Sequence, residues 1–161
     1  MSYLKLFGAA LIILSGIVFL RSYRKYEKER IAAATSLLAL LRRATEEALT
    51  LLTPIKEIVL KVEDEVLLAR GFVTEYSESL SLSAAFDKVA GRYRGRIFSL
   101  LSEGFSSLQG KLSCNRGDSL FSECEKMRAE LELEKEMTEK NIKVTTTLTV
   151  AAVLGLIILF L

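Results

Sequence analysis

The side chains that most often carry catalysis or bind metal ions are scarce in this sequence. The chain of 161 residues has no histidine and two cysteines, Cys114 and Cys124. Histidine is the commonest general base and metal ligand, and two thiols without histidine or a second cysteine pair do not make a zinc site. We therefore expect no catalytic, metal-binding or cofactor-binding residue, with Cys124 in a core and Cys114 in a loop.

Three further patterns resemble functional motifs but have simpler interpretations. The glycines at positions 91, 95, 104, 110 and 117 are scattered and lack the Lys-Ser/Thr of a phosphate-binding loop. Arg116-Gly117-Asp118 spells an adhesion tripeptide, but we interpret Gly117 as a turn between helices and Asp118 as an N-cap. The net charge of +2 is too small to favour nucleic-acid binding, and no small-molecule substrate is expected.

One spacing does indicate an interaction site. Thr147, Ala151 and Gly155 recur every four residues, which places three small residues in a ridge on one face of a predicted helix. Such ridges allow helix backbones to approach closely in a membrane, where packing must supply the attraction. We predict that this ridge contacts the first apolar helix or a neighbouring subunit. The alternative is that the spacing arises by chance.

The ridge lies in the second of two apolar runs, which stand near the two ends of the sequence. Residues 4–20 carry one charge, Lys5, and residues 144–161 carry none. A hydrocarbon core of about 30 Å needs roughly 20 apolar residues in a helix, so both runs qualify as helices that span a lipid bilayer. With two spans, the middle of the chain is expected to lie on one side of the membrane, tethered at both ends.

The charges beside the two runs predict which side that is. Basic residues follow the first run and precede the second: Arg21, Arg24, Lys25, Lys28, Arg30, Lys135, Lys140 and Lys143. Lysine and arginine near span ends favour the cytoplasmic face, so we expect a cell-membrane protein whose middle domain is cytoplasmic. A cleaved signal peptide is the alternative for the first run. It is disfavoured because the basic cluster follows the run and no A-x-A site is present.

Between the runs, apolar residues recur at the helical spacing of three or four. The first stripe comprises Ile31, Ala34, Leu38, Leu41, Thr45, Ala48 and Leu52. This helix should end near Leu52, because the residue before Pro54 avoids the α region, and Thr53 should cap the next helix. The second stripe, which Gly71 should break or bend, comprises Ile55, Ile58, Val59, Val62 and Val66. Residues 72–91 predict two short helices with a break near Ser81.

Two more stripes complete the predicted domain. The third comprises Ile97 or Phe98, Leu101, Phe105, Leu108 and Leu112, and the last helix should start near Asp118 and bury Leu120, Cys124, Met127 and Leu131. Residues 132–143 are polar on all faces, which predicts a charged helical stalk rather than core. The sequence thus predicts an all-α protein. Residues 22–131 form a cytoplasmic antiparallel bundle of about four to six helices, and residues 1–21 and 144–161 form transmembrane helices at its two ends.

Three places in the chain resemble a known family. The opening LKLFGA precedes an apolar run and a basic helix, and Thr53-Pro54-Ile55 follows a long first helix. Near the end, a Gly117-Asp118 turn precedes a long charged helix that closes on EKNIK and leads into a glycine-containing span. Over essentially its whole length, the chain resembles the stage III sporulation protein AB family. That family is similar to the cytoplasmic helical domain of type II secretion F-type inner-membrane proteins.

The resemblance implies a structural role rather than catalysis. It implies a membrane platform subunit of a secretion-like channel complex required for endospore formation, on the mother-cell side of the outer forespore membrane. The implied partners are the membrane subunits of that complex and a cytoplasmic secretion-type ATPase, whose motion the helical domain would couple to the assembly. The alternative function is a membrane-tethered helical scaffold or signalling adaptor unrelated to sporulation.

Overall fold

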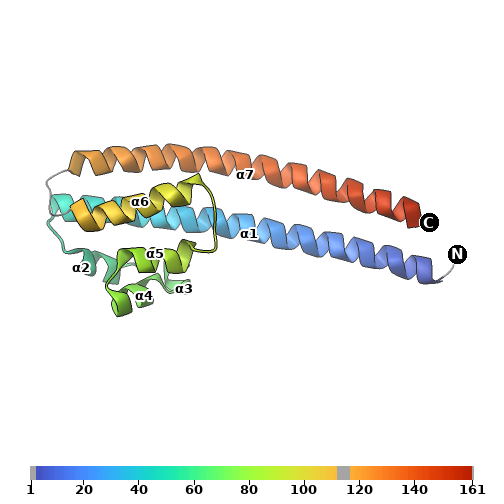
Figure 1. Ribbon diagram of the computed structural model, residues 1–161, viewed down its shortest axis with the longest axis horizontal. Coiled ribbons are helices and arrows are strands. Elements are labelled where there is room, and N and C mark those ends of the chain that lie inside the picture. Colours follow the sequence, from blue (N-terminus) through green and yellow to red (C-terminus); the bar gives the residue numbers. More distant parts are fainter. Residues whose placement is uncertain (1–2, 112–116, 161) are drawn as a thin grey trace. The chain divides into compact units, whose positions relative to one another are not determined.

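The computed structural model describes residues 3–111 and 117–160, and every element in these ranges is a helix (Figure 1). The helices are α1 (Tyr3–Thr50), α2 (Ile55–Leu60), α3 (Glu65–Ala69), α4 (Phe72–Ser79), α5 (Leu82–Ala90), α6 (Arg96–Lys111) and α7 (Gly117–Phe160). The predicted all-α class is confirmed, as are two long helices that carry the apolar runs. The predicted loop at Cys114, the side chain of Asp118 and the predicted stripe position Leu112 lie outside the described residues.

The chain divides into two compact units. The helix-pair unit comprises Met1–Glu29 and Lys135–Leu161, and the core unit comprises Arg30–Glu134. The helices α1 and α7 each contribute one segment to each unit. These divisions at Arg30 and Glu134 lie within the residues for which the sequence predicts a basic helix and a stalk.

The core unit is organised around one cluster of buried apolar side chains. Leu37 and Leu41 of α1 are 0% and 1% exposed, and Phe105 of α6 is 1% exposed. The ring of Phe105 contacts two other buried rings, with centroids 6.1 Å from Phe72 and 5.6 Å from Phe86. Because aromatic side chains bury large areas, these ring contacts stabilise the packing of α4, α5 and α6.

Three predicted stripes are confirmed where they are described, apart from Ile31 and Leu52 of the first stripe, which are half-buried and exposed. The buried residues include Ala34, Leu38, Leu41, Thr45 and Ala48 of α1, Ile97, Phe98, Leu101, Phe105 and Leu108 of α6, and Leu120, Cys124, Met127 and Leu131 of α7. The core segment of α1 buries a wider arc than the stripe predicts, because Ala33, Leu37, Leu40 and Ala44 are also buried. This segment is therefore covered from more than one side.

The predicted end of the first stripe is wrong. Leu52 is 83% exposed because α1 ends at Thr50 and Leu52 has a left-handed backbone with φ of 52°. The backbone N–H of Thr53 donates to the carbonyl of Glu47 at 3.2 Å and closes the helix end. Thr53 does not cap α2 as expected: Pro54 is the N-cap residue, and no side chain caps the helix.

The second predicted helix is two helices, α2 and α3. The carboxylate of Asp64 accepts hydrogen bonds from the backbone N–H groups of Val66 and Leu67 at 2.9 and 3.0 Å, which starts a new helix there. This restart changes the register, so Leu67 rather than Val66 is buried. The break predicted near Ser81 is confirmed, since Ser81 is the N-cap residue of α5 and accepts from the N–H of Ala84.

Candidate functional site

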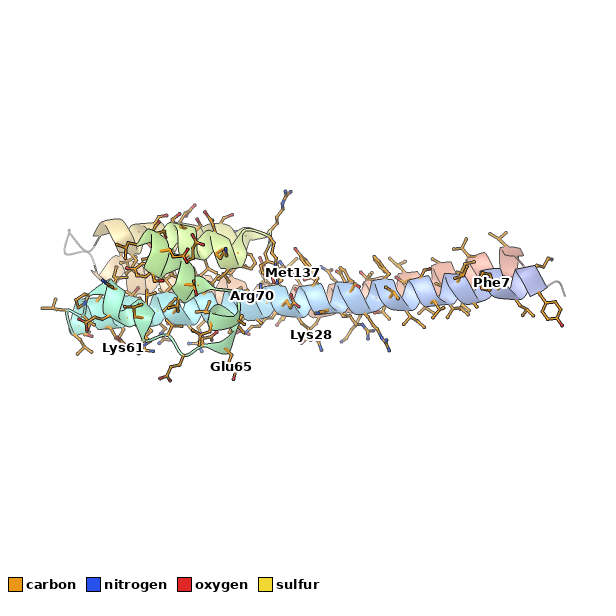
Figure 2. All side chains as sticks on the ribbon, turned by 90° about the horizontal axis from the view of Figure 1, so that it is seen from below. Phe7, Lys28, Lys61, Glu65, Arg70 and Met137 are labelled. Atoms are coloured by element: carbon orange, nitrogen blue, oxygen red, sulfur yellow. The ribbon has the colours of Figure 1, made fainter. Side chains whose placement is uncertain are left out.

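The apolar side chains of the helix-pair unit are largely uncovered by the protein itself. Leu14 of α1 is 56% exposed, and Leu148 and Ile158 of α7 are 65% and 76% exposed. Figure 2 shows the side chains along these helices and labels Phe7, which is 65% exposed. Both helices are long and apolar enough to cross a membrane by length and composition. Exposed apolar surface of this extent indicates contact with a membrane or another protein.

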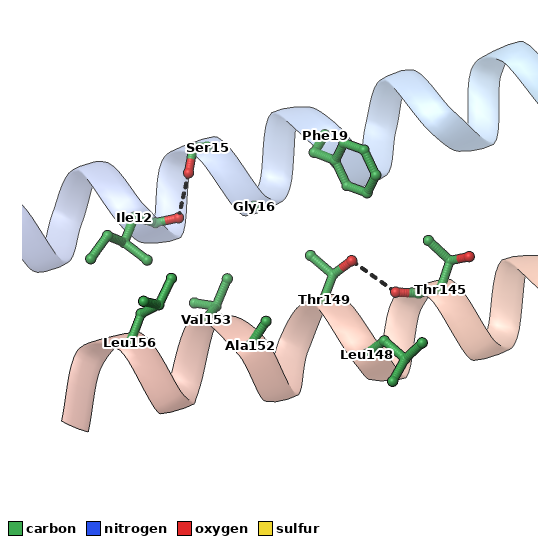
Figure 3. A pocket seen from close by; sticks show the side chains of 10 residues that line it. All are labelled: Ile12, Ser15, Gly16, Phe19, Thr145, Leu148, Thr149, Ala152, Val153 and Leu156. Atoms are coloured by element: carbon green, nitrogen blue, oxygen red, sulfur yellow. Dashed lines mark hydrogen bonds between the residues drawn. The ribbon is translucent and has the colours of Figure 1, made fainter. Parts of the chain in front are cut away.

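The two helices of this unit approach each other at Gly16. Figure 3 shows Gly16 of α1 opposite Val153 and Thr149 of α7. A Cβ atom added at Gly16 would lie 2.8 Å from Cγ2 of Val153 and 3.8 Å from Cγ2 of Thr149. The missing side chain therefore permits this close approach, as small residues do between membrane helices.

The hydroxyl groups near this contact are satisfied within their own helices. Ser15 donates to the carbonyl of Ile12 at 2.9 Å, and Thr149 donates to the carbonyl of Thr145 at 2.8 Å (Figure 3). An unsatisfied polar group is costly in hydrocarbon, so these bonds make the hydroxyls compatible with an apolar environment.

A hydrogen bond joins the two helices at the basic end of the unit. The guanidinium of Arg24 donates from Nη2 to Oγ1 of Thr146 at 3.0 Å, and Thr146 in turn donates to the carbonyl of Ile142. Arg24 belongs to the basic segment that the sequence places beside the first span. Its guanidinium thus contacts α7 in addition to contributing charge.

The predicted ridge of Thr147, Ala151 and Gly155 lies on a face of α7 different from the one that meets α1. All three residues are exposed, and open space surrounds the position where a Cβ of Gly155 would lie. The residues that line the contact with α1 are two positions further along, at Thr149 and Val153. A shift of two residues is about 200° around a helix. The ridge therefore faces away from α1.

A polar cluster in the core unit joins α1, α6 and α7. Nη1 of Arg30 lies 2.9 Å from Oε2 of Glu134, and their side chains are 15% and 13% exposed. Oε1 of Glu134 accepts from the backbone N–H of Ile97 at 3.3 Å, in the first turn of α6. Glu134 thus places a negative charge at the N-terminus of α6, where the helix dipole favours it.

A glycine makes room for this ion pair. Gly95 has φ of 145°, and a Cβ there would lie 3.1 Å from both Nη1 of Arg30 and Oε1 of Glu134. Nη1 of Arg30 also donates to the carbonyl of Arg94 at 3.3 Å. Arg30 therefore binds the turn before α6, and Glu134 binds the first turn of α6.

Among the described residues, Cys124 and Tyr76 have shifted pKa values, and both are buried. Burial raises the pKa of the Cys124 thiol, and a hydrogen bond with Thr45 opposes that shift. The prediction that Cys124 lies in a core is confirmed, since it is 4% exposed. Burial also raises the pKa of Tyr76. Because a thiol with a raised pKa is a poor nucleophile, Cys124 fits a packing role.

Sequence reasoning missed the contacts at Gly16 and at the Arg30–Glu134 pair. Gly16 lies in a continuous apolar run, where the helical period does not reveal which face meets another helix. Arg30 and Glu134 each lie in segments rich in charge, so neither stands out from its neighbours. The available signal was Gly95 between two arginines, since a glycine at such a position often allows close approach.

Comparison of the chain with protein-family models, with curated proteins and with solved structures finds no match. The functional argument therefore depends on the residues and their geometry. The resemblance to stage III sporulation protein AB stays a prediction.

Proposed function

We propose that this chain is a non-catalytic membrane protein with two spans, formed by the apolar segments of α1 and α7. The observation that supports this proposal is the exposure of those segments: their most apolar windows are 6% and 0% buried. A soluble protein would cover so much apolar surface with its own chain. The basic residues beside both segments support a cytoplasmic location of the core unit.

In this proposal the core unit is an antiparallel helical bundle with transmembrane helices at both ends. Its buried cluster draws on every helix from α1 to α7, as a single folded domain requires. The short connections between α2, α3, α4 and α5 favour neighbouring helices that reverse direction.

The proposed role is that of a platform subunit in a secretion-like channel complex for endospore formation. Each span is continuous with a core helix, since α1 and α7 contain no break between their apolar and core segments. A continuous helix transmits displacement better than a flexible linker. A secretion-type ATPase that binds the core unit could thus move the membrane subunits, which are the other expected partners.

Co-purification tests this role. The full chain, tagged and extracted in mild detergent from sporulating cells, should retain the ATPase and other membrane subunits of the complex. The Leu41→Asp variant serves as the control, because loss of the core unit should release the ATPase. Recovery of signalling proteins without an ATPase would contradict the platform role and favour the membrane-tethered adaptor.

A further inference from the structure

The turn between α5 and α6 presents arginine side chains to solvent. Residues 91–96 read Gly-Arg-Tyr-Arg-Gly-Arg, without an acidic residue. Arg92, Arg94 and Arg96 are exposed, whereas Tyr93 is 4% exposed. The alternation thus directs one side chain into the core unit and three basic ones outward. We name residues 91–96 the arginine turn.

The arginine turn is held firmly in place. The ring of Tyr93 stacks on Phe98 with centroids 5.5 Å apart, and its hydroxyl accepts hydrogen bonds from Arg70 and Arg92. Both guanidinium groups lie 5.0 Å from the centre of the Tyr93 ring. A basic surface that is already ordered loses little entropy when it binds a charged partner.

The position of the turn indicates its partner. The carbonyl of Arg94 in the turn accepts from Arg30, and the backbone N–H of Ile97, the residue after the turn, donates to Glu134. Arg30 and Glu134 are the residues at which the core unit continues into the helix-pair unit along the chain. The joining segments carry further basic residues: Arg21, Arg24, Lys25, Lys28, Lys135, Lys140 and Lys143. We propose that the arginine turn contacts anionic phospholipid headgroups at the membrane that the chain spans. This inference depends on the proposed membrane anchoring.

Arg94 and Arg96 remain exposed although acidic groups lie near them. Nε of Arg96 lies 3.8 Å from Oε1 of Glu130, but its side chain is still 77% exposed. Asp87 and Glu103 line the same surface groove as Arg94. Exposed pairs of this kind are weak, so anionic headgroups can compete with them for the arginines. Each basic residue close to an anionic leaflet is attracted to it by about 1 kcal/mol.

Energy transfer in nanodiscs tests this proposal with the full chain. The sequence contains no tryptophan, so Ser99→Trp adds a single donor at an exposed position beside the turn. The acceptor is a dansyl group on the lipid headgroup. We expect more transfer in nanodiscs of phosphatidylcholine with phosphatidylglycerol than in phosphatidylcholine alone, and we expect high salt to remove the difference.

Two charge-matched variants make the result specific. Arg94→Gln with Arg96→Gln should lower the ratio of bound to free turn about fivefold for each arginine. Lys56→Gln with Lys61→Gln, in and just after α2, should leave it unchanged. Equal transfer in both lipids, or a difference that survives loss of the arginines, would overturn the proposal; in the first case an acidic protein segment becomes the partner to test. Failure of the chain to enter nanodiscs would instead refute the membrane anchoring.

Discussion

The two units of this protein use the same pair of helices in opposite ways. In the core unit, Leu37 and Leu41 of α1 are 0% and 1% exposed. In the helix-pair unit, Leu14 and Phe19 of the same helix are 56% and 53% exposed. Residues of the same apolar kind are thus covered by protein in one unit and uncovered in the other. The difference supports the proposal that a bilayer covers the second set.

The largest effect is expected from placing a charge in each unit. Leu41→Asp should unfold the core unit, because an unpaired buried carboxylate costs several kcal/mol of a total stability of about 5–15 kcal/mol. Circular dichroism and limited proteolysis of the full chain in detergent measure the loss. Leu14→Asp is the matched control: it should leave the core unit folded and reduce membrane insertion, at a cost of about 3 kcal/mol. A Leu41→Asp protein as stable as its parent would contradict the core assignment.

The next largest effect is expected from removing an aromatic side chain from each unit. Phe105→Ala should destabilise the core unit by about 3–5 kcal/mol, because it removes a buried ring and leaves a cavity beside Phe72 and Phe86. Phe19→Ala, on the uncovered surface, should change the denaturation midpoint much less. Chemical denaturation followed by circular dichroism gives both values. Equal losses from the two substitutions would remove the distinction between the units.

A smaller effect distinguishes the two faces of α7. Gly16→Leu should weaken the pairing of α1 and α7 by about 1–3 kcal/mol, because the new side chain collides with Val153. Gly155→Leu and Ala151→Leu should leave this pairing intact, since the predicted ridge faces away from α1. Disulfide crosslinking between cysteines placed at Ile12 and Leu156 measures the pairing.

The same ridge variants also test its predicted partner. If the ridge binds a neighbouring subunit, Gly155→Leu and Ala151→Leu should insert and fold but lose that subunit on purification. A change at Ile158, off the ridge, should be tolerated. Unchanged co-purification would indicate that the four-residue spacing of the ridge arises by chance.

The smallest effect concerns the ion pair at the boundary of the core unit. A double-mutant cycle with Arg30→Gln and Glu134→Gln should give a coupling of about 1 kcal/mol, because both side chains are mostly buried. The exposed pair Arg42–Glu125, at 3.9 Å, is the control and should give a coupling near zero. Equal coupling in the two cycles would show that the Arg30 cluster does not fix the turn before α6.

The sequence predicts the helices well where one apolar face is buried. The stripes of α6 and α7 follow from their spacing, because a helix of this length buries a single face. The break at Asp64 was not foreseen, since the spacing of apolar residues from Ile55 to Val66 also fits one continuous helix. A side-chain cap decides between the two structures, and a single capping residue is a weak signal within a charged segment.

The candidate sites were less predictable, because they depend on contacts between distant segments. Residues of α7 that are four apart form several rows along the helix, and the sequence does not show which row contacts α1. The position of Gly16 on the other helix determines this. Likewise, the sequence shows the three arginines of the arginine turn close together but not which residues they lie beside. Its relation to Arg30 and Glu134 arises only when three helices meet.

The central claim is that the two apolar segments span a membrane and hold the core unit in the cytoplasm. Single cysteines at Ser2, Glu78 and Leu161, in a Cys114→Ser/Cys124→Ser background, test it most directly by labelling intact cells with an impermeant maleimide. Glu78 is suitable because it is exposed on α4. The account predicts that both terminal cysteines are labelled in intact cells and that position 78 is labelled only after lysis. Labelling of position 78 in intact cells would contradict it.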